Sequence, residues 1–398
     1  MNQRDAARTR ARAQRALLAA ALLAAPARAE QPPPPAPSAW FAARGPHIEA
    51  VSSAGGDDAG ALALQLERAL AAASRLLDAD PSLLPPVTAI SLTAADGYAY
   101  LRPLSGAPAF LHVAPERATL VLDGALREQS LTAAQHSLTH LLAASDPRPR
   151  PLWLEEGGAE LVSTARVTGD ALELGRPPRA RLEWFALATL HPLKRVLSAR
   201  ETLRWSQHAR EGLAAESWAL LHFLRSGDRA GFPARADRLA SYLALVNGGM
   251  PPERACAEAF GLEAAALEAE LLRFLSFGEP PRERIALASL GAPGALPAEP
   301  LVPARRDALL GELALSLGRG AWAPAERWLR SAALYDPASK ARLAQLRALR
   351  GDERAQLEPL LAEAELASAA GGADAASLSA LALARLALAT RAHPPDAD

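Results

Sequence analysis

The sequence predicts an α+β fold, with a sheet near the N-terminus and helices over most of the remaining chain. Short strand-like runs of apolar residues stand before about residue 125, and two of them flank a segment with apolar residues at helical spacing. From Leu131 onward the helical pattern dominates. Strands grouped at one end and helices at the other are typical of α+β proteins. Half of the 398 residues are hydrophobic, enough for a sizeable core and for two or three domains.

The N-terminal segment 1–29 carries the features of an export signal. Five arginines precede the apolar run 16–25, and Ala27-Arg28-Ala29 then follows with the small residues of a cleavage site. This order predicts a signal peptide over 1–29, and hence an exported protein, periplasmic or secreted, although an ordinary amphipathic helix is the alternative. The run is too short to span a bilayer, so we expect no membrane span after cleavage. A proline-rich linker is predicted over 30–44.

Charge and cysteine content point to no particular partner. The formal net charge is −1, and no block of Lys or Arg follows the leader, so nucleic acid and anionic membranes are poor candidates. The chain has one cysteine, Cys256, which cannot form an intramolecular disulfide and which we expect in the core.

The folded part is expected to begin at Gly45 with alternating strands and one helix. The apolar pattern predicts strands and a helix at these positions: strands over 47–53, 87–93, 110–113 and 119–122, and a helix over 58–77. We expect the strand 119–122 to lie at an edge of the sheet, where an extended peptide can pair with it.

Two helices are predicted next. Thr132-Ala133-Ala134-Gln135 fits a capping box, so we expect a helix from Thr132 to about Ala144, ended by Asp146-Pro147. A second helix should start near Leu152 and contains Gly157-Gly158. Each glycine inside a helix costs roughly 1 kcal/mol, so this pair predicts close packing against a neighbour.

Gly278-Glu279-Pro280-Pro281 marks the boundary predicted between a domain over 45–280 and an all-α domain over 281–398. The second domain contains a spaced set of small, aromatic and proline residues: Gly320, Trp322, Ala325, Ala332 and Pro337. These positions resemble the turn, second helix and closing proline of a tetratricopeptide repeat. Further helix pairs are expected over 339–369 and over 375–392, with turns at Gly351-Asp352 and Gly371-Gly372.

His136 and His140 form the chemical motif with the clearest meaning. In His136-Ser137-Leu138-Thr139-His140 the two imidazoles are at positions i and i+4, so they lie on one face of a helix. Both can then bind one metal ion, with Zn–N distances of about 2.0 to 2.1 Å. The bland alternative is a pair of polar residues on a solvated helix face, so the motif needs support from its context.

The context is the segment Trp153-Leu154-Glu155-Glu156-Gly157-Gly158-Ala159-Glu160, which follows the histidine helix after a connection rich in proline. A histidine helix followed by such a segment resembles the gluzincin metallopeptidases, most closely the peptidase MA-like family. The resemblance covers about 45–277. It implies a gluzincin-like domain with a mixed sheet, Glu156 as the third zinc ligand, and Glu160 as an acidic residue that hydrogen-bonds a ligand histidine and fixes its tautomer.

The later segment from Glu216 to Leu224 is similar to a buried helix of the same family. It contains His222, which could donate to a reaction intermediate. We expect it instead to be a hydrogen-bonded core residue, because a histidine within an apolar helical run usually has that role.

Ser137 departs from the family pattern. In HExxH enzymes this position is a glutamate that takes a proton from zinc-bound water and passes it to the leaving amine. A serine hydroxyl has no useful basicity near neutral pH, and nothing around Ser137 suggests a nucleophile. Glu155 is a possible replacement, but on a helix it points away from the direction of Glu156.

The sequence therefore favours an exported, metallopeptidase-like protein that binds zinc, and a peptide or protein ligand, with impaired catalysis. Two alternatives stay open. One is an active zinc peptidase with a non-standard base, and the other is a helical-repeat scaffold for protein interactions.

Overall fold

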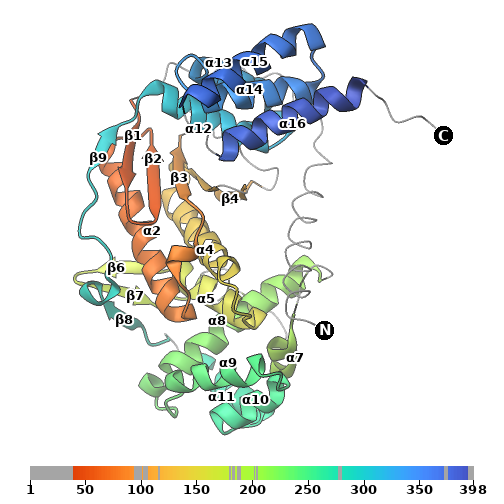
Figure 1. Cartoon of the computed structure of the whole chain (residues 1–398). Coiled ribbons are helices and arrows are strands. Elements are labelled where there is room, and N and C mark those ends of the chain that lie inside the picture. Colours follow the sequence, from red (N-terminus) through yellow and green to blue (C-terminus); the bar gives the residue numbers. More distant parts are fainter. Residues whose placement is uncertain are drawn as a thin grey trace, which may run out of the picture.

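The computed structural model describes residues 39–93, 101, 106–114, 117–178, 181, 184–185, 190–200, 202, 205–276, 280–371 and 375–392. The predicted signal peptide and most of the predicted linker lie outside these residues. Figure 1 shows a central sheet with one group of helices at each end. The α+β class predicted from the sequence is confirmed. None of the helices in the described part is both long and apolar enough to cross a membrane.

The main sheet has six strands among the described residues, in the order β4-β5-β3-β2-β1-β9. Its strands are β1 (Phe41–Arg44), β2 (Ile48–Ser52), β3 (Val87–Leu92), β4 (Ala109–Val113), β5 (Ala118–Asp123) and β9 (Ala298–Pro300). β2, β3 and β5 run parallel to one another, while β4, β1 and β9 are each antiparallel to their neighbours. The sheet is therefore mixed, as expected.

The side chains of the main sheet belong to two separate hydrophobic cores, because successive side chains of a strand point to opposite faces of the sheet. On β3, Val87 and Ala89 join the core that contains α2 (Gly56–Leu77) and α4 (Arg127–Ser145). Ile90 and Leu92 join the core formed with the C-terminal helices. Both faces of the sheet are covered, which explains why β3 is buried along its whole length.

Beyond α4 the chain forms α5 (Leu152–Ser163), a small antiparallel sheet and a group of helices. The small sheet has the order β6-β7-β8. Its strands are β6 (Arg166–Thr168), β7 (Ala171–Leu174) and β8 (Glu283–Ala286). The helices are α7 (Leu193–Ser198), α8 (Gln207–Ser226), α9 (Leu239–Asn247), α10 (Pro252–Phe260) and α11 (Ala264–Ser276).

The C-terminal helices form the other end of the molecule. They are α12 (Pro303–Ser316), α13 (Trp322–Ala332), α14 (Pro337–Arg350), α15 (Arg354–Gly371) and α16 (Ala375–Ala392). Gly351 ends α14 in the left-handed conformation that favours glycine, so the turn expected there is present. The segment 375–392, expected as a helix pair, is one helix, because no turn interrupts its run of Ala and Leu.

Four other expectations from the sequence are wrong. α4 begins at Arg127, so Thr132 lies inside the helix, where its hydroxyl donates to the carbonyl of Glu128 instead of capping. The strand 119–122 belongs to β5, which is no edge strand because β3 and β4 pair with it on both sides. Residues 41–44, placed in the linker, form β1. The region after 281 is not helical throughout, because β8 and β9 extend the two sheets.

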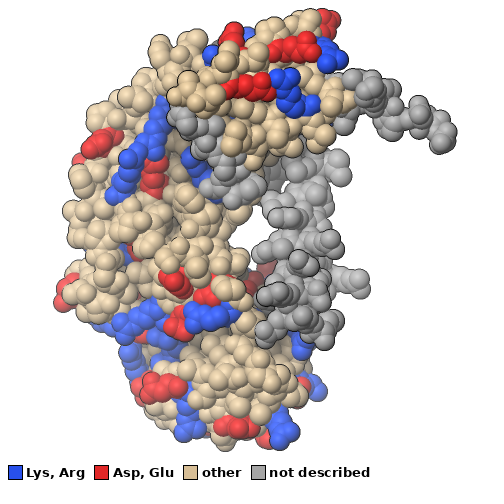
Figure 2. All heavy atoms as spheres, viewed as in Figure 1, with Lys and Arg blue, Asp and Glu red and all other residues tan. Residues whose placement is uncertain are grey.

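Charged side chains of both signs are interspersed on the face of the molecule drawn in Figure 2. Basic and acidic side chains lie beside one another on this face, and neither sign forms a continuous area. Many of these charges are paired, as in the bonds from Arg305 to Glu49, which connect α12 to the strand β2.

Candidate metal centre

α4 and α5 position the candidate ligands. The apolar side of α4, with Leu138 and Leu142, is buried in the core beneath the sheet, and this leaves His136 and His140 half-buried on another side. Glu156 comes from the first half of α5, which packs against α4 and α8. The two predicted histidines and the predicted glutamate are therefore brought together from two neighbouring helices.

α5 approaches α8 closely at Gly157, the residue after Glu156. A Cβ atom at Gly157 would lie 2.5 Å from the backbone oxygen of Ser217 on α8. At Gly158 a Cβ would lie 2.8 Å from the side chain of Leu77 on α2. The two glycines thus allow α5 to pack between two helices, in agreement with the close packing that the sequence predicts.

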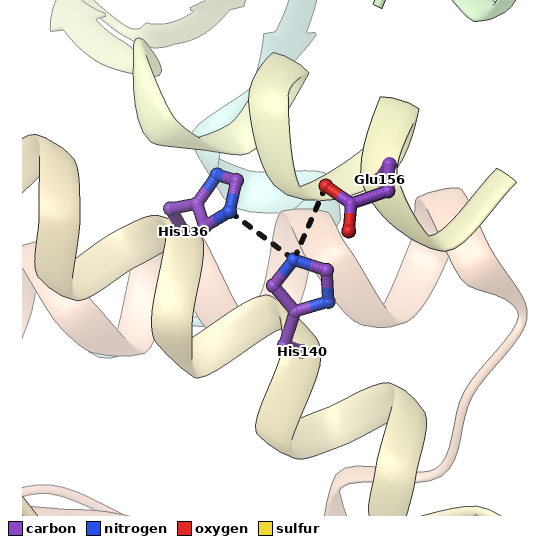
Figure 3. A group of neighbouring side chains, drawn as sticks. All are labelled: His136, His140 and Glu156. Atoms are coloured by element: carbon purple, nitrogen blue, oxygen red, sulfur yellow. Dashed lines mark hydrogen bonds and ion pairs between the residues drawn. The ribbon is translucent and has the colours of Figure 1, made fainter. Parts of the chain in front are cut away.

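The three side chains converge with the spacing of metal ligands (Figure 3). The Nε2 atoms of His136 and His140 are 3.1 Å apart, and Nε2 of His140 is 3.7 Å from Oε2 of Glu156. The ligand atoms of all three residues lie within 4.8 Å of one another. Two ligands of a tetrahedral zinc ion, each at about 2.0 to 2.1 Å, are about 3.3 Å apart. The donor set and its spacing therefore fit zinc.

His136 and Glu156 are held in the protonation states that bind a cation, whereas the raised pKa of His140 favours a protonated ring that competes with one. Burial lowers the pKa of His136, and the nearby His140 lowers it further, so this imidazole is neutral near pH 7. Burial alone would raise the pKa of Glu156, but the adjacent His140 outweighs burial and lowers it. Burial alone would lower the pKa of His140, but the adjacent Glu156 has the larger effect and raises the pKa of this imidazole. Glu156 is thus held as a carboxylate, the form that binds a metal ion.

Glu160 lies behind His136, one turn after Glu156 on α5. Its Oε1 is 3.6 Å from Nδ1 of His136, an ion-pair distance that is longer than a hydrogen bond. The carboxylate also accepts two hydrogen bonds from Arg181, of 2.6 Å and 3.2 Å. Arg181 was not predicted from the sequence, because no spacing pattern relates it to α5.

Ser137 lies on α4 beside the ligands and is half-buried. It provides a hydroxyl where a general base would need a carboxylate or an imidazole. Glu155 is near enough for its charge to raise the pKa of His140.

His222 lies in the core, in a different environment from the three ligands. Its ring contacts Trp218 and Phe274, and its Nε2 donates to the carbonyl of Pro281 over 2.7 Å. A Cβ at Gly175 would lie 2.6 Å from the same nitrogen, so the space around the ring is filled. These contacts give His222 a structural role as a hydrogen-bonded core residue.

Comparison of the chain with protein-family models, with curated proteins and with solved structures finds no match.

Proposed function

We propose that this chain is an exported, zinc-binding protein of the gluzincin metallopeptidase type whose catalytic step is impaired. The single observation that supports it best is the convergence of His136, His140 and Glu156, from two packed helices, within 4.8 Å. The buried carboxylate of Glu160 next to His136 adds support, since ligand histidines usually have such a partner.

In this proposal the two imidazoles and the carboxylate hold the metal and leave one position open for water or a peptide carbonyl. Bound zinc polarises a carbonyl and makes bound water more acidic. Ser137 cannot move the proton that hydrolysis requires, and general acid–base catalysis is typically worth about 10² to 10⁴ in rate. The site would therefore bind a peptide more effectively than it cleaves one.

Metal analysis of the purified protein tests the binding half of the proposal. We expect about one equivalent of zinc in the unmodified protein, and less than about a tenth of an equivalent after His140→Ala, since one of three ligands is lost. His222→Ala is the control for the loss of a histidine, because this side chain packs against aromatic rings of the core and not against the three ligands. An unmodified protein without zinc would refute the proposal.

Ser137→Glu tests the catalytic half. Restoring a carboxylate at this position should raise zinc-dependent peptide cleavage by about 10² to 10⁴ over the unmodified protein. Ser137→Gln is the matched control, because glutamine has nearly the same shape as glutamate but cannot act as a base. Equal activity of the two variants would show that the site is not a peptidase site lacking only its base.

An active peptidase with a different base is a second candidate. The observation that favours it is the position of Glu155, whose charge acts on His140. It predicts measurable cleavage by the unmodified protein that a chelator abolishes and that Glu155→Gln removes. Cleavage that survives Glu155→Gln would exclude this residue as the base.

A helical-repeat scaffold is the third candidate, favoured by the successive packing of α12 to α16. Several leucines on the last two helices are exposed, among them Leu366, Leu378 and Leu386. Truncation after Pro281 is unsuitable as a test, because it would also remove β8 and β9 from the sheets. Leu366→Glu and Leu386→Glu should instead abolish binding of a peptide or protein ligand. Unchanged binding would exclude the exposed leucines of α15 and α16 as the binding surface.

A further inference from the structure

Arg181 is joined to the candidate metal centre through one carboxylate. Its Nη2 donates to Oε1 of Glu160 over 2.6 Å, and its Nε donates to Oε2 over 3.2 Å. The side chain of Glu160 is only 4% exposed and that of Arg181 is 18% exposed. Two parallel bonds of this kind fix the plane of a carboxylate as well as its position.

A buried carboxylate needs such a partner. Leaving one ion of a buried pair without its counter-ion is strongly unfavourable, so Arg181 stabilises the carboxylate of Glu160 in its buried place. Among the described residues, two side chains with nitrogen atoms lie within 4 Å of the Glu160 carboxylate, the charged Arg181 and the neutral ring of His136. Arg181 therefore decides how the carboxylate is presented to the histidine.

The same oxygen of Glu160 serves both neighbours. Oε1 accepts from Arg181 and faces Nδ1 of His136 at 3.6 Å, while the other ring nitrogen of His136 faces His140. A carboxylate on the Nδ1 side favours the tautomer with its proton on Nδ1, which leaves the Nε2 lone pair for a metal ion. The chain of contacts from Arg181 through Glu160 ends at a candidate ligand.

We propose that Arg181 is a positioning residue of this metal centre, which orients His136 by holding both oxygens of Glu160. The inference rests on the proposed function, because it assumes that the three ligands bind zinc. It assigns a role to a residue that touches neither the metal position nor a ligand directly.

The direction in which zinc affinity changes when Arg181 is removed distinguishes a positioning role from an effect of its charge alone. Arg181 is a cation near a site for a cation, so if only its charge mattered, its removal would strengthen zinc binding. If it acts by positioning Glu160, its removal must weaken zinc binding. Loss of a partner behind a metal ligand typically costs about 10- to 100-fold in metal affinity.

The experiment measures zinc affinity by competition with a chromophoric chelator, using the full-length chain. We expect Arg181→Ala to weaken zinc binding by roughly tenfold or more. Arg181→Lys keeps the charge but loses the two-pronged geometry, so it should bind with intermediate affinity. Arg225→Ala is the matched control, because Arg225 holds Glu283 in the same way, over 2.9 Å and 2.5 Å, at a similar exposure of 17%.

A double variant tests whether Arg181 acts through Glu160. Glu160→Gln alone should weaken zinc binding, and adding Arg181→Ala to it should weaken binding no further, since the intermediary is already lost. Circular dichroism of each variant verifies that the helices are retained. Arg181→Ala that binds zinc as tightly as the unmodified protein, or more tightly, would overturn the inference alone. An unmodified protein that binds no zinc would overturn the proposed function with it.

Discussion

Gly157→Ala is the most direct test of the packing that positions Glu156. An added Cβ would lie 2.5 Å from the backbone oxygen of Ser217 and 3.1 Å from Cβ of Leu221. Ordinary contact begins at 3.4 Å, so the oxygen is about 0.9 Å too close, and a backbone atom cannot rotate away as a side chain can. α5 and α8 would have to separate.

The expected cost follows from two opposing effects. Overpacking a tight site typically costs about 1 to 3 kcal/mol, and here the obstacle is backbone, so the upper part of that range applies. Replacing a glycine inside a helix by alanine stabilises the helix by about 1 kcal/mol, because alanine has the higher helix propensity. We therefore expect Gly157→Ala to lower the free energy of unfolding by about 1 to 2 kcal/mol.

Gly158→Ala is the control within the same helix. Its Cβ would be 2.8 Å from Cδ2 of Leu77, the end of a flexible side chain, and the next atoms are at 3.4 Å or more. Small rotation of Leu77 relieves this contact, so the gain in helix propensity leaves stability nearly unchanged. Urea unfolding followed by tryptophan fluorescence measures both variants, because Trp153 and Trp218 are buried on α5 and α8. Equal midpoints for the two variants would refute the reasoning.

Two further predictions concern groups away from the metal centre. Hydrogen bonds from Arg148 and Arg150 hold the pKa of Asp146 well below its usual range, so its stabilising contribution is complete above about pH 4, the unfolded pKa, and is lost as the pH falls further. We expect Asp146→Asn to lower the free energy of unfolding by about 3 kcal/mol at pH 7, because Arg150 would keep a buried charge without its partner. The variant should also lose less stability than the unmodified protein as the pH falls below 4. An equally steep loss of stability in both proteins would contradict this. Burial raises the pKa of the Cys256 thiol to about 11, so a thiol reagent at pH 8 should react only after the chain is unfolded, and rapid labelling of the native protein would disprove it.

The elements that the sequence predicted well are those with a strong local pattern. The strands over 87–93 and 110–113 and the helix over 58–77 agree closely with β3, β4 and α2. The helix has apolar residues at helical spacing, and the two strands are short apolar runs that follow prolines. The end of α4 at Asp146-Pro147 was also predicted, since a proline just after the helix disfavours its continuation.

Apart from the single helix over 375–392, the misses have a common cause, which is that tertiary contacts overrode or supplied the local signal. Thr132 carries a good capping sequence, but the helix starts earlier because Ser130 is already anchored to the carbonyls of Pro108 and Asp123. β9 is very short and has no periodicity of its own, so pairing with β1 alone defines it. A local pattern cannot report such partners.

The candidate site shows the same division. His136, His140 and Glu156 were predicted together because two of them share a helix face and the third belongs to a distinctive segment. Arg181 was missed because it lies in a stretch without a regular pattern, and only folding places it against Glu160. Residues that bind a metal directly are restricted in type and spacing, whereas residues that support them are not.

The pairing of β9 with β1 also determines when the sheet can be completed during synthesis. Phe41 pairs with Pro300, so β1 waits for a partner that is made only after most of the chain has been synthesised. At a rate of about 5 to 20 residues per second, making the intervening chain takes about 13 to 50 s. Until then one side of β1 keeps unsatisfied backbone groups that can recruit another nascent chain.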